Sequence, residues 1–364
     1  MRHGRLPLTY GECRARFRRA AADAGRDVVA HPLAATGPQG ERLTIDVVTL
    51  GAAAPARALV VQSGVHGVEG FIGSAVQCDL LDVLRPEELP PDMAVVVIHA
   101  VNPWGMAWGR RQNESNVDLN RNWRRDEGVP FPNVAYEELH PLACPDTPDL
   151  PPVDELLERA LELVGERGLS WVRDGITAGQ YTHPDGLHYG GERTEESNRL
   201  LELAILPGLA GVERLLTVDL HTGHGPAGRL TLLSDEPPGS PQDRFLRHLC
   251  APGCVVEATE GNPEATTGTK AGQIANGYGR LLGAASAVAT SAEFGTVPDE
   301  EQLVATYLES WVHRHGDRRR PEHAEVAWRY RCCFTPDDED WELDALAAGC
   351  ALLRRAVDAV AGWD

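Results

Sequence analysis

Short apolar segments alternate with longer amphipathic segments along most of the chain. The short segments contain few polar residues, which is typical of strands in a sheet that helices cover on both faces. The longer segments carry apolar residues at helical spacing. We expect strands at residues 43–51, 58–64, 93–102, 214–223, 229–234, 254–258 and 285–295. We expect helices at 70–84, 152–168, 194–207, 240–250, 299–314 and 341–361, after a basic helix at 10–25.

The alternation predicts the α/β class, with a mixed, largely parallel central sheet flanked by helices. Proline is dense between residues 128 and 153, which favours a long surface loop over a linker between independent domains. We therefore expect one domain over residues 1–364, with a loop-rich insertion around 124–192.

The charge of the chain restricts its partners. Thirty-four basic and 54 acidic residues give a formal net charge of −20, which opposes binding to nucleic acid or to an anionic membrane. Small molecules or peptides are the expected partners. The first residues lack the continuous apolar core of a signal peptide, and no run of about 18 apolar residues follows. These features predict a cytoplasmic protein.

The eight cysteines are scattered, and no pair of Cys-x-x-Cys motifs suggests a structural zinc site. Cys250 and Cys254, beside His248, resemble part of a metal cluster, but no second pair completes it. The simplest interpretation is that the thiols are reduced.

The segment "VVQSGVHGVEGFIGSA" places His66 and Glu69 three residues apart, directly after an expected strand. At that spacing two side chains fall on the same side of a turn and can bind one ion. Zinc sites of hydrolases use such nitrogen and oxygen ligands and leave one position for water. Taken alone, the pair is more typical of a hydrogen-bonded glycine-rich turn than of a metal site.

A third ligand is available at the end of another strand. The stretch "TVDLHTGHG" presents His221 there, and Asp219, two residues earlier, could hold the imidazole in place or satisfy the sheet backbone. His224 is a competing ligand, but it lies beyond Gly223 in a glycine-rich loop. Ligands bind at the carboxyl ends of the strands in open α/β sheets, so we expect a site where His66, Glu69 and His221 follow or end their strands.

Two further stretches carry polar residues after apolar strands. "AVATSAEFGT" presents Glu293, which could pair with a basic group or act as a base beside zinc. "NPWGMAWGRRQNESNVDLNRNW" contains arginine and asparagine side chains that could bind a carboxylate and polarise a carbonyl, although an ordinary surface loop would also be polar.

Together these motifs resemble the zinc metallocarboxypeptidase superfamily, which also contains deacylases of the aspartoacylase and succinylglutamate desuccinylase type. The resemblance rests on His66-x-x-Glu69, "NPWG", "NVDLNRNW", His221 and Glu293, in the order of that superfamily, over residues 58–296. The stretch "GQYTHPDGLHYGG" (179–191) is similar to a branch known mainly as a domain of unknown function.

The resemblance implies one Zn²⁺ per chain and assigns roles to individual residues. Zinc would be bound by His66, Glu69 and His221, and Glu293 would act as the general base. The resemblance gives Asn120 and Arg121 the role of holding a substrate carboxylate. It also gives Arg111, or alternatively Arg110, the role of stabilising the oxyanion.

One expected residue has no clear match. In the peptidases a mobile tyrosine closes over the substrate, and the nearest tyrosine before Glu293 is Tyr278, which is closer in sequence than the superfamily's spacing. Tyr181 or Tyr189, in the 179–191 stretch, could instead line the pocket, although a turn at 184–186 explains the glycine there as well.

The expected function is hydrolysis of an amide in a small peptide or another carboxylate-bearing substrate, by a zinc-bound water that a glutamate activates. An N-acyl amino acid deacylase and a non-catalytic ligand-binding scaffold are the alternatives. A serine hydrolase is disfavoured because the chain has no Gly-x-Ser-x-Gly motif.

Overall fold

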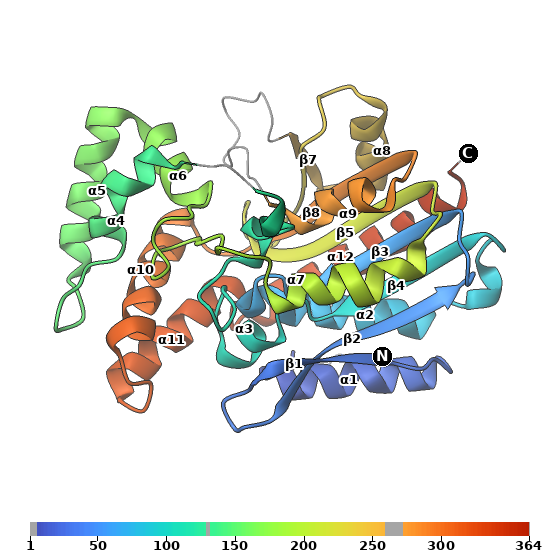
Figure 1. The fold of residues 1–364 in the computed structure, drawn as a ribbon, viewed down its shortest axis with the longest axis horizontal. Coiled ribbons are helices and arrows are strands. Elements are labelled where there is room, and N and C mark those ends of the chain that lie inside the picture. The colour runs from blue at the N-terminus through green and yellow to red at the C-terminus, as the bar shows by residue number, and fades with distance from the viewer. Residues whose placement is uncertain (1–5, 129–131, 259–271, 364) are drawn as a thin grey trace.

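The computed structural model describes residues 6–128, 132–258 and 272–363. One eight-stranded sheet runs through the molecule, in the order β1-β2-β4-β3-β5-β8-β6-β7 (Figure 1). The strands are β1 (Val29–Thr36), β2 (Arg42–Gly51), β3 (Arg57–Ser63), β4 (Met93–His99), β5 (Arg214–Gly223), β6 (Leu230–Ser234), β7 (Val255–Ala258) and β8 (Ser286–Gly295).

The centre of this sheet is parallel. Strands β4, β3, β5 and β8 lie side by side and run in one direction, whereas β1, β2 and β6 join the sheet through antiparallel pairs. The carboxyl ends of the four central strands therefore meet at one edge of the sheet. This arrangement confirms the predicted mixed, largely parallel sheet.

Helices cover both faces of the sheet (Figure 1). Helices α2 (Gly70–Val83), α8 (Pro241–Leu249) and α12 (Glu339–Ala361) pack with one apolar core, and α3 (Pro103–Trp108) and α9 (Ile274–Leu282) pack with the other. Alternate residues of β5 point into the two cores, with Leu216 and Val218 on one face and Leu215 on the other. The second face also carries the polar residues of the site.

The remaining helices lie around this framework. They are α1 (Tyr10–Asp23), α4 (Val134–Ala143), α5 (Val153–Arg167), α6 (Leu169–Thr177), α7 (Glu196–Leu200), α10 (Asp299–His315) and α11 (Pro321–Phe334). Helices α4, α5 and α6 form a group beside α10 at one end of the molecule (Figure 1). In the described part of the chain, no helix is both long enough and apolar enough to cross a bilayer.

The predicted strands and most of the predicted helices are confirmed within one to three residues. The expected loop at 128–153 is wrong over part of its length, because α4 occupies residues 134–143. Asn133 caps this helix by accepting a hydrogen bond from the backbone N–H of Tyr136, and Pro141 lies in the last turn. A proline so close to the helix end removes little helical hydrogen bonding, so the proline density did not indicate loop alone.

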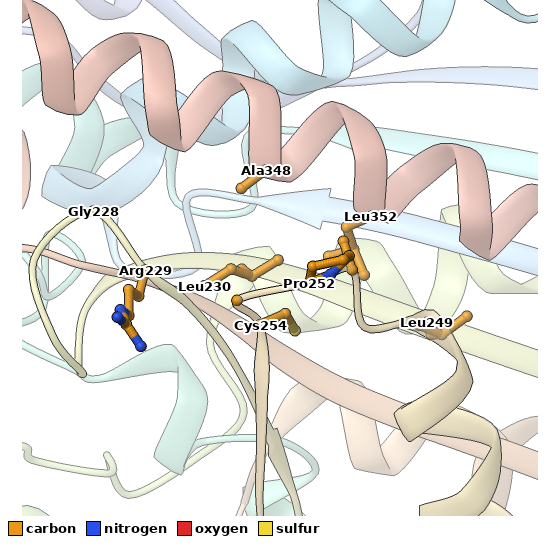
Figure 2. A pocket seen from close by; sticks show the side chains of 10 residues that line it. Gly228, Arg229, Leu230, Leu249, Pro252, Cys254, Ala348 and Leu352 are labelled. Carbon is orange, nitrogen blue, oxygen red and sulfur yellow. The ribbon is translucent and has the colours of Figure 1, made fainter.

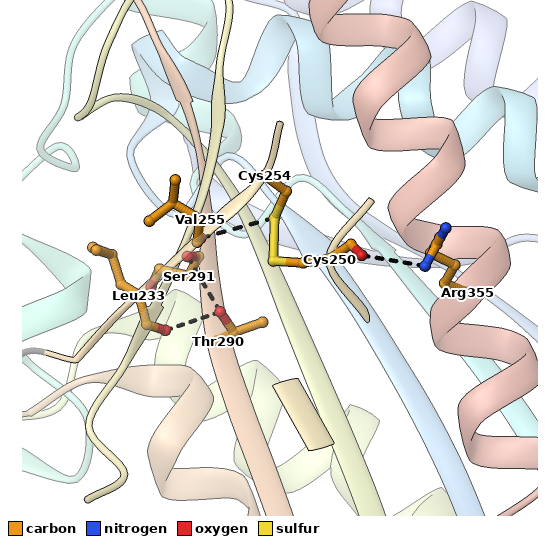
Figure 3. The surroundings of a disulfide bond; sticks show 7 residues. All are labelled: Leu233, Cys250, Cys254, Val255, Thr290, Ser291 and Arg355. Atoms are coloured by element: carbon orange, nitrogen blue, oxygen red, sulfur yellow. Dashed lines mark hydrogen bonds between the residues drawn. A yellow bond between two sulfur atoms is a disulfide. The ribbon is translucent and has the colours of Figure 1, made fainter. Parts of the chain in front are cut away.

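The expectation that all thiols are reduced is wrong for one pair, because Cys250 and Cys254 form a disulfide (Figure 3). The turn after α8 brings their Cα atoms to 5.2 Å, which is within the range of disulfides. Cys254 also lines a pocket of about 230 Å³ between α12 and the start of β6 (Figure 2). None of the predicted site residues lines this pocket.

Candidate metal centre

The predicted ligands come together at the carboxyl edge of the parallel strands. His66 and Glu69 lie in the turn that follows β3, where residues Gly67–Glu69 form a single 3₁₀ turn before α2. His221 lies near the end of β5, the strand that pairs with β3. Candidate ligand atoms of these three residues all lie within 4.8 Å of one another, and all three side chains are buried.

Glu69 stands between the two imidazoles. One carboxylate oxygen, Oε1, is 2.9 Å from Nδ1 of His66, and the other, Oε2, is 2.9 Å from Nδ1 of His221. The His66 contact is short but is not aligned as a hydrogen bond, so the buried Nδ1 atom has no hydrogen-bond partner among the described residues. Two imidazole nitrogens and a carboxylate at these distances match the ligand types of zinc.

Each imidazole has an acidic residue at its opposite nitrogen. Asp118 Oδ1 is 3.3 Å from Nε2 of His66, and Asp219 Oδ2 is 2.8 Å from Nε2 of His221, although the second contact lies off the N–H direction. Carboxylates in this position fix the orientation and tautomer of metal-binding histidines. The position of Asp219 agrees with the outer partner expected from the sequence.

The electrostatics of the cluster favour a cation. Burial opposes ionisation of the Glu69 carboxyl, but the charge of His66 and a hydrogen bond with His221 hold its pKa below the ordinary value. Burial also opposes a charged His221, yet Asp219 and Glu69 keep the pKa of that imidazole well above its ordinary value. Surroundings that attract a proton in this way also attract a metal ion.

The two candidate arginines are separated by the fold. Arg111 enters the cluster, with NH1 3.1 Å from Glu69 Oε1 and Nε 3.1 Å from Asp118 Oδ2. Arg110 turns away and forms a buried ion pair with Glu309 of α10, at 3.0 Å. A guanidinium has five N–H donors, and Arg111 uses two of them here. The geometry therefore favours Arg111 over Arg110 for contact with a bound substrate.

The two residues of the predicted carboxylate clamp, Asn120 and Arg121, make different contacts in the fold. Asn120 is buried, and its side-chain oxygen accepts a hydrogen bond from the backbone N–H of Ile274 at 3.0 Å. The guanidinium of Arg121 donates to the carbonyl oxygens of Ala178, Asn120 and Thr177 at 3.1, 2.9 and 2.7 Å. Arg121 thus holds the end of α6 in place, which leaves Asn120 as the better placed of the two to bind a ligand.

Glu293 lies directly beside His221 in the sheet. The two residues pair in the parallel register of β5 and β8, so their side chains leave the same face of the sheet. The carboxylate is half-buried, and Oε2 accepts a weak hydrogen bond of 3.5 Å from the backbone N–H of His224. His224 itself is held 3.0 Å from Glu257 and so does not join the three candidate ligands.

The three tyrosines considered from the sequence occupy different positions. Tyr278 is fully buried in α9, where its hydroxyl donates to Gln62 at 2.5 Å, so it cannot be a mobile lid. Tyr181 donates from its hydroxyl to the carbonyl oxygen of Arg121 at 2.7 Å. Tyr189 is buried, and its carbonyl oxygen accepts from the backbone N–H of Asp118 at 2.7 Å. These contacts hold the loop in position, and neither of them is with a candidate metal ligand.

The sequence analysis missed the residue that connects these parts. Asp118 is completely buried and contacts His66, Arg111 and His188, the last through Nδ1 at 3.3 Å. Burial opposes its ionisation, but Arg111 and Arg121 hold the pKa of its carboxyl well below the ordinary value. The signal was present, since Asp118 is the one acid within the "NVDLNRNW" motif.

Several solved structures are similar to this chain in fold at low sequence identity. Carboxypeptidase A from Helicoverpa armigera is 13% identical, with a TM-score of 0.47 over 92% of this chain and 75% of that one. A presumed metallopeptidase from Shewanella amazonensis SB2B is 14% identical, with a TM-score of 0.45 over 84% and 94%. A succinylglutamate desuccinylase/aspartoacylase from Rhodobacter sphaeroides is 17% identical, with a TM-score of 0.38 over 80% and 66%.

No curated protein matches the sequence. A family described as a protein of unknown function, DUF2817, matches residues 7–348, which is most of the chain and includes every predicted site residue. The match confirms the expected branch, known mainly as a domain of unknown function. The chain belongs to the DUF2817 family.

Proposed function

We propose that this protein is a zinc-dependent amide hydrolase that acts on a small peptide or another carboxylate-bearing substrate. The observation that supports it best is the convergence of His66, Glu69 and His221 at the carboxyl edge of the sheet. A second carboxylate, Glu293, lies beside His221 in the register of the sheet. Zinc bound by the three ligands would supply a Lewis acid that polarises a carbonyl and makes water more acidic.

Three residues of the chain would carry out proton transfer, stabilisation of the oxyanion and binding of the substrate carboxylate. Glu293 takes a proton from the attacking water and returns it to the departing amine, which is the role of a general base that then acts as an acid. Arg111 donates N–H groups to the carbonyl oxygen as negative charge develops on it. Asn120, whose side-chain oxygen is fixed by Ile274, directs its NH₂ group toward a carboxylate of the substrate.

The metal is tested first by analysing the metal content of purified variants. The wild type is expected to contain zinc at the candidate centre, and His66→Ala and His221→Ala are each expected to lose that ion. His248→Gln, which changes an exposed histidine at the end of α8, is the matched control. Retention of the same zinc content in both ligand variants would show that the centre is elsewhere.

The reaction is tested with a panel of peptides that have a free C-terminus and a panel of N-acyl amino acids. We expect Glu293→Gln to lower kcat by about 10²–10⁴-fold while the metal content stays unchanged. Glu300→Gln, at an exposed glutamate in the first turn of α10, should leave kcat unchanged. Hydrolysis by Glu293→Gln at the wild-type rate would exclude the proposed base, and no turnover of either panel by the zinc-loaded wild type would oppose the proposed reaction.

A further inference from the structure

A second group of metal-ligand residues lies outside the candidate centre. His140, in the last turn of α4, faces His183 and Asp185, which belong to the 179–191 loop. Candidate ligand atoms of these three residues all lie within 4.8 Å of one another. The set of two imidazoles and a carboxylate is of the same type as the set at the candidate centre, and nothing in the proposed reaction uses it.

The loop presents its two ligands through a tight turn. The backbone N–H of Gly186 donates to the carbonyl oxygen of His183 at 2.9 Å, which closes the turn over residues 183–186. Gln180 supports the turn, because its side-chain oxygen accepts from the N–H of His183 at 2.8 Å and its NH₂ donates to the His183 carbonyl at 2.7 Å. His183 and Asp185 are therefore held in position by the backbone of the loop.

Helix α4 presents the third ligand, His140. His140 and Glu137 are three residues apart and share one face of the helix. The carboxylate of Glu137 lies 2.9 Å from Nε2 of His183, and Asp185 Oδ1 lies 3.9 Å from Nε2 of His140. Asp185 is also 3.9 Å from Arg314, a distance that leaves its oxygens without a close hydrogen bond to either group.

The ring nitrogens of His140 make no close hydrogen bond among the described residues. Its Nδ1 atom is buried without a hydrogen-bond partner among the described residues, and its Nε2 atom has only the long contact with Asp185. Its ring stacks on that of His183, with the ring centroids 3.8 Å apart and the planes inclined by 18°, so one ring must turn for both to direct a nitrogen at one ion.

We propose that His140, His183 and Asp185 form a second transition-metal site that fastens the 179–191 loop to α4, with Glu137 beside it. Zinc suits these ligands. The side chains of His140 and His183 are 16% and 27% exposed, so an ion can reach the site from solvent. The function of this site is structural, because its ligands join two segments and none of them belongs to the candidate centre.

The fastened loop borders the candidate centre. His188, five residues after His183, contacts Asp118, which in turn contacts His66. The side-chain NH₂ of Asn116 also donates to the carbonyl oxygens of Pro184 and Gly186, at 2.9 and 3.1 Å. Binding of metal at the second site would therefore restrict the segment that carries His188.

The test is a zinc titration of protein from which metal has been removed with a chelator, followed by measurement of the zinc content after desalting. We expect two ions per chain in the wild type and one in His140→Gln and in His183→Asn. His248→Gln, at an exposed histidine, should bind two. The inference is overturned if His140→Gln and His183→Asn bind as many ions as the wild type.

The double variant His66→Ala/His221→Ala separates this inference from the proposed function. It should bind one ion, and adding His183→Asn should remove that ion. If the candidate centre binds no metal, the wild type will bind a single ion that persists in the double variant and disappears in His183→Asn, which still supports the second site.

Hydrogen exchange provides a measurement independent of stoichiometry and of activity. Zinc should slow exchange of the amides of residues 180–191 in the His66→Ala/His221→Ala variant, but not after His183→Asn is added to it. Equal slowing in this triple variant, with its circular dichroism spectrum unchanged, would contradict the second site.

Discussion

Asp118 links three motifs that are separate in the sequence. It binds His66 from the turn after β3, Arg111 from the loop after α3 and His188 from the 179–191 loop. A substitution to asparagine keeps its size but removes the charge that orients the histidine. We expect Asp118→Asn to weaken zinc binding by about 10–100-fold, the usual effect of losing an outer partner of a metal ligand.

Competition with a chelator of known zinc affinity measures this change. Asp126→Asn is the matched control, since Asp126 is half exposed and pairs with Arg199 on the surface. Zinc affinity in Asp118→Asn equal to that of the control would mean that Asp118 only supports the fold.

The structure predicts different defects for the two neighbouring arginines. Arg111→Met should lower kcat by about 10²–10³-fold at saturating zinc, the effect of losing one donor to the developing oxyanion. Arg110→Met should instead destabilise the fold, because it leaves Glu309 buried with fewer partners. An unpaired buried charge reduces the free energy of unfolding by about 3–5 kcal/mol. The reduction in Arg110→Met should be smaller, because Arg318 remains 2.7 Å from Glu309.

Kinetics and urea unfolding of both variants separate these effects. A large fall in kcat for folded Arg110→Met, with Arg111→Met fully active, would reverse the assignment.

Single residues could be predicted from the sequence where a motif places them at a strand end. His66, Glu69, His221 and Glu293 follow or end apolar strands, and the parallel register brings those ends together. The partners of Arg121 could not be predicted, because the carbonyl oxygens of Thr177 and Ala178 reach it from a segment more than fifty residues away. A polar loop motif shows which side chains are present, but it does not show which distant residues they contact.

At the scale of elements, the sequence predicts those whose apolar residues are buried in the cores of the molecule. Strand β5 and helix α12 are of this kind and agree closely with the prediction. Strand β1 was missed because it lies at the sheet edge, contains Pro32 and exposes most of its residues. Helix α11 was missed because it is rich in charged residues and only five of its 14 residues are buried.

The attachment of α1 to the sheet should depend on pH. Asp46 of β2 is completely buried and receives two hydrogen bonds from Arg18 and one from Arg14 of α1. Burial alone would raise the pKa of its carboxyl, but Arg18 and Thr44 lower it below the ordinary value. The ionised form therefore stabilises the fold above the ordinary pKa, and this contribution is lost as the pH falls through the lower pKa of the folded state.

We expect Asp46→Asn to reduce the free energy of unfolding by about 1–3 kcal/mol near neutral pH, the usual range for hydrogen bonds to a charged group. The difference from the wild type should shrink as the pH is lowered below about 4. Urea unfolding at several pH values measures it, with Asp92→Asn, whose partner is Arg57, as a more exposed ion-pair control. A difference that stays constant with pH would mean that the charge of Asp46 contributes nothing.

At the scale of the whole molecule, the net charge of −20 opposes the approach of a substrate that carries a carboxylate. Arg111 counters that charge locally, but two of its donors already bind Glu69 and Asp118. Long-range repulsion should therefore dominate at low salt. Raising the ionic strength from about 0.01 M to 0.15 M shortens the Debye length from about 30 Å to 8 Å, which screens distant charges more than buried contacts.

We therefore expect kcat/KM for a peptide with a free C-terminus to rise with salt over this range, while kcat/KM for the same peptide with an amidated C-terminus changes less. The ratio of the two values isolates the carboxylate, because every other effect of salt acts on both peptides. If kcat/KM of the free peptide falls with salt relative to that of the amidated peptide, the positive groups at the site outweigh the net charge of the molecule. A constant ratio would show that neither the net charge nor these positive groups act on the substrate carboxylate.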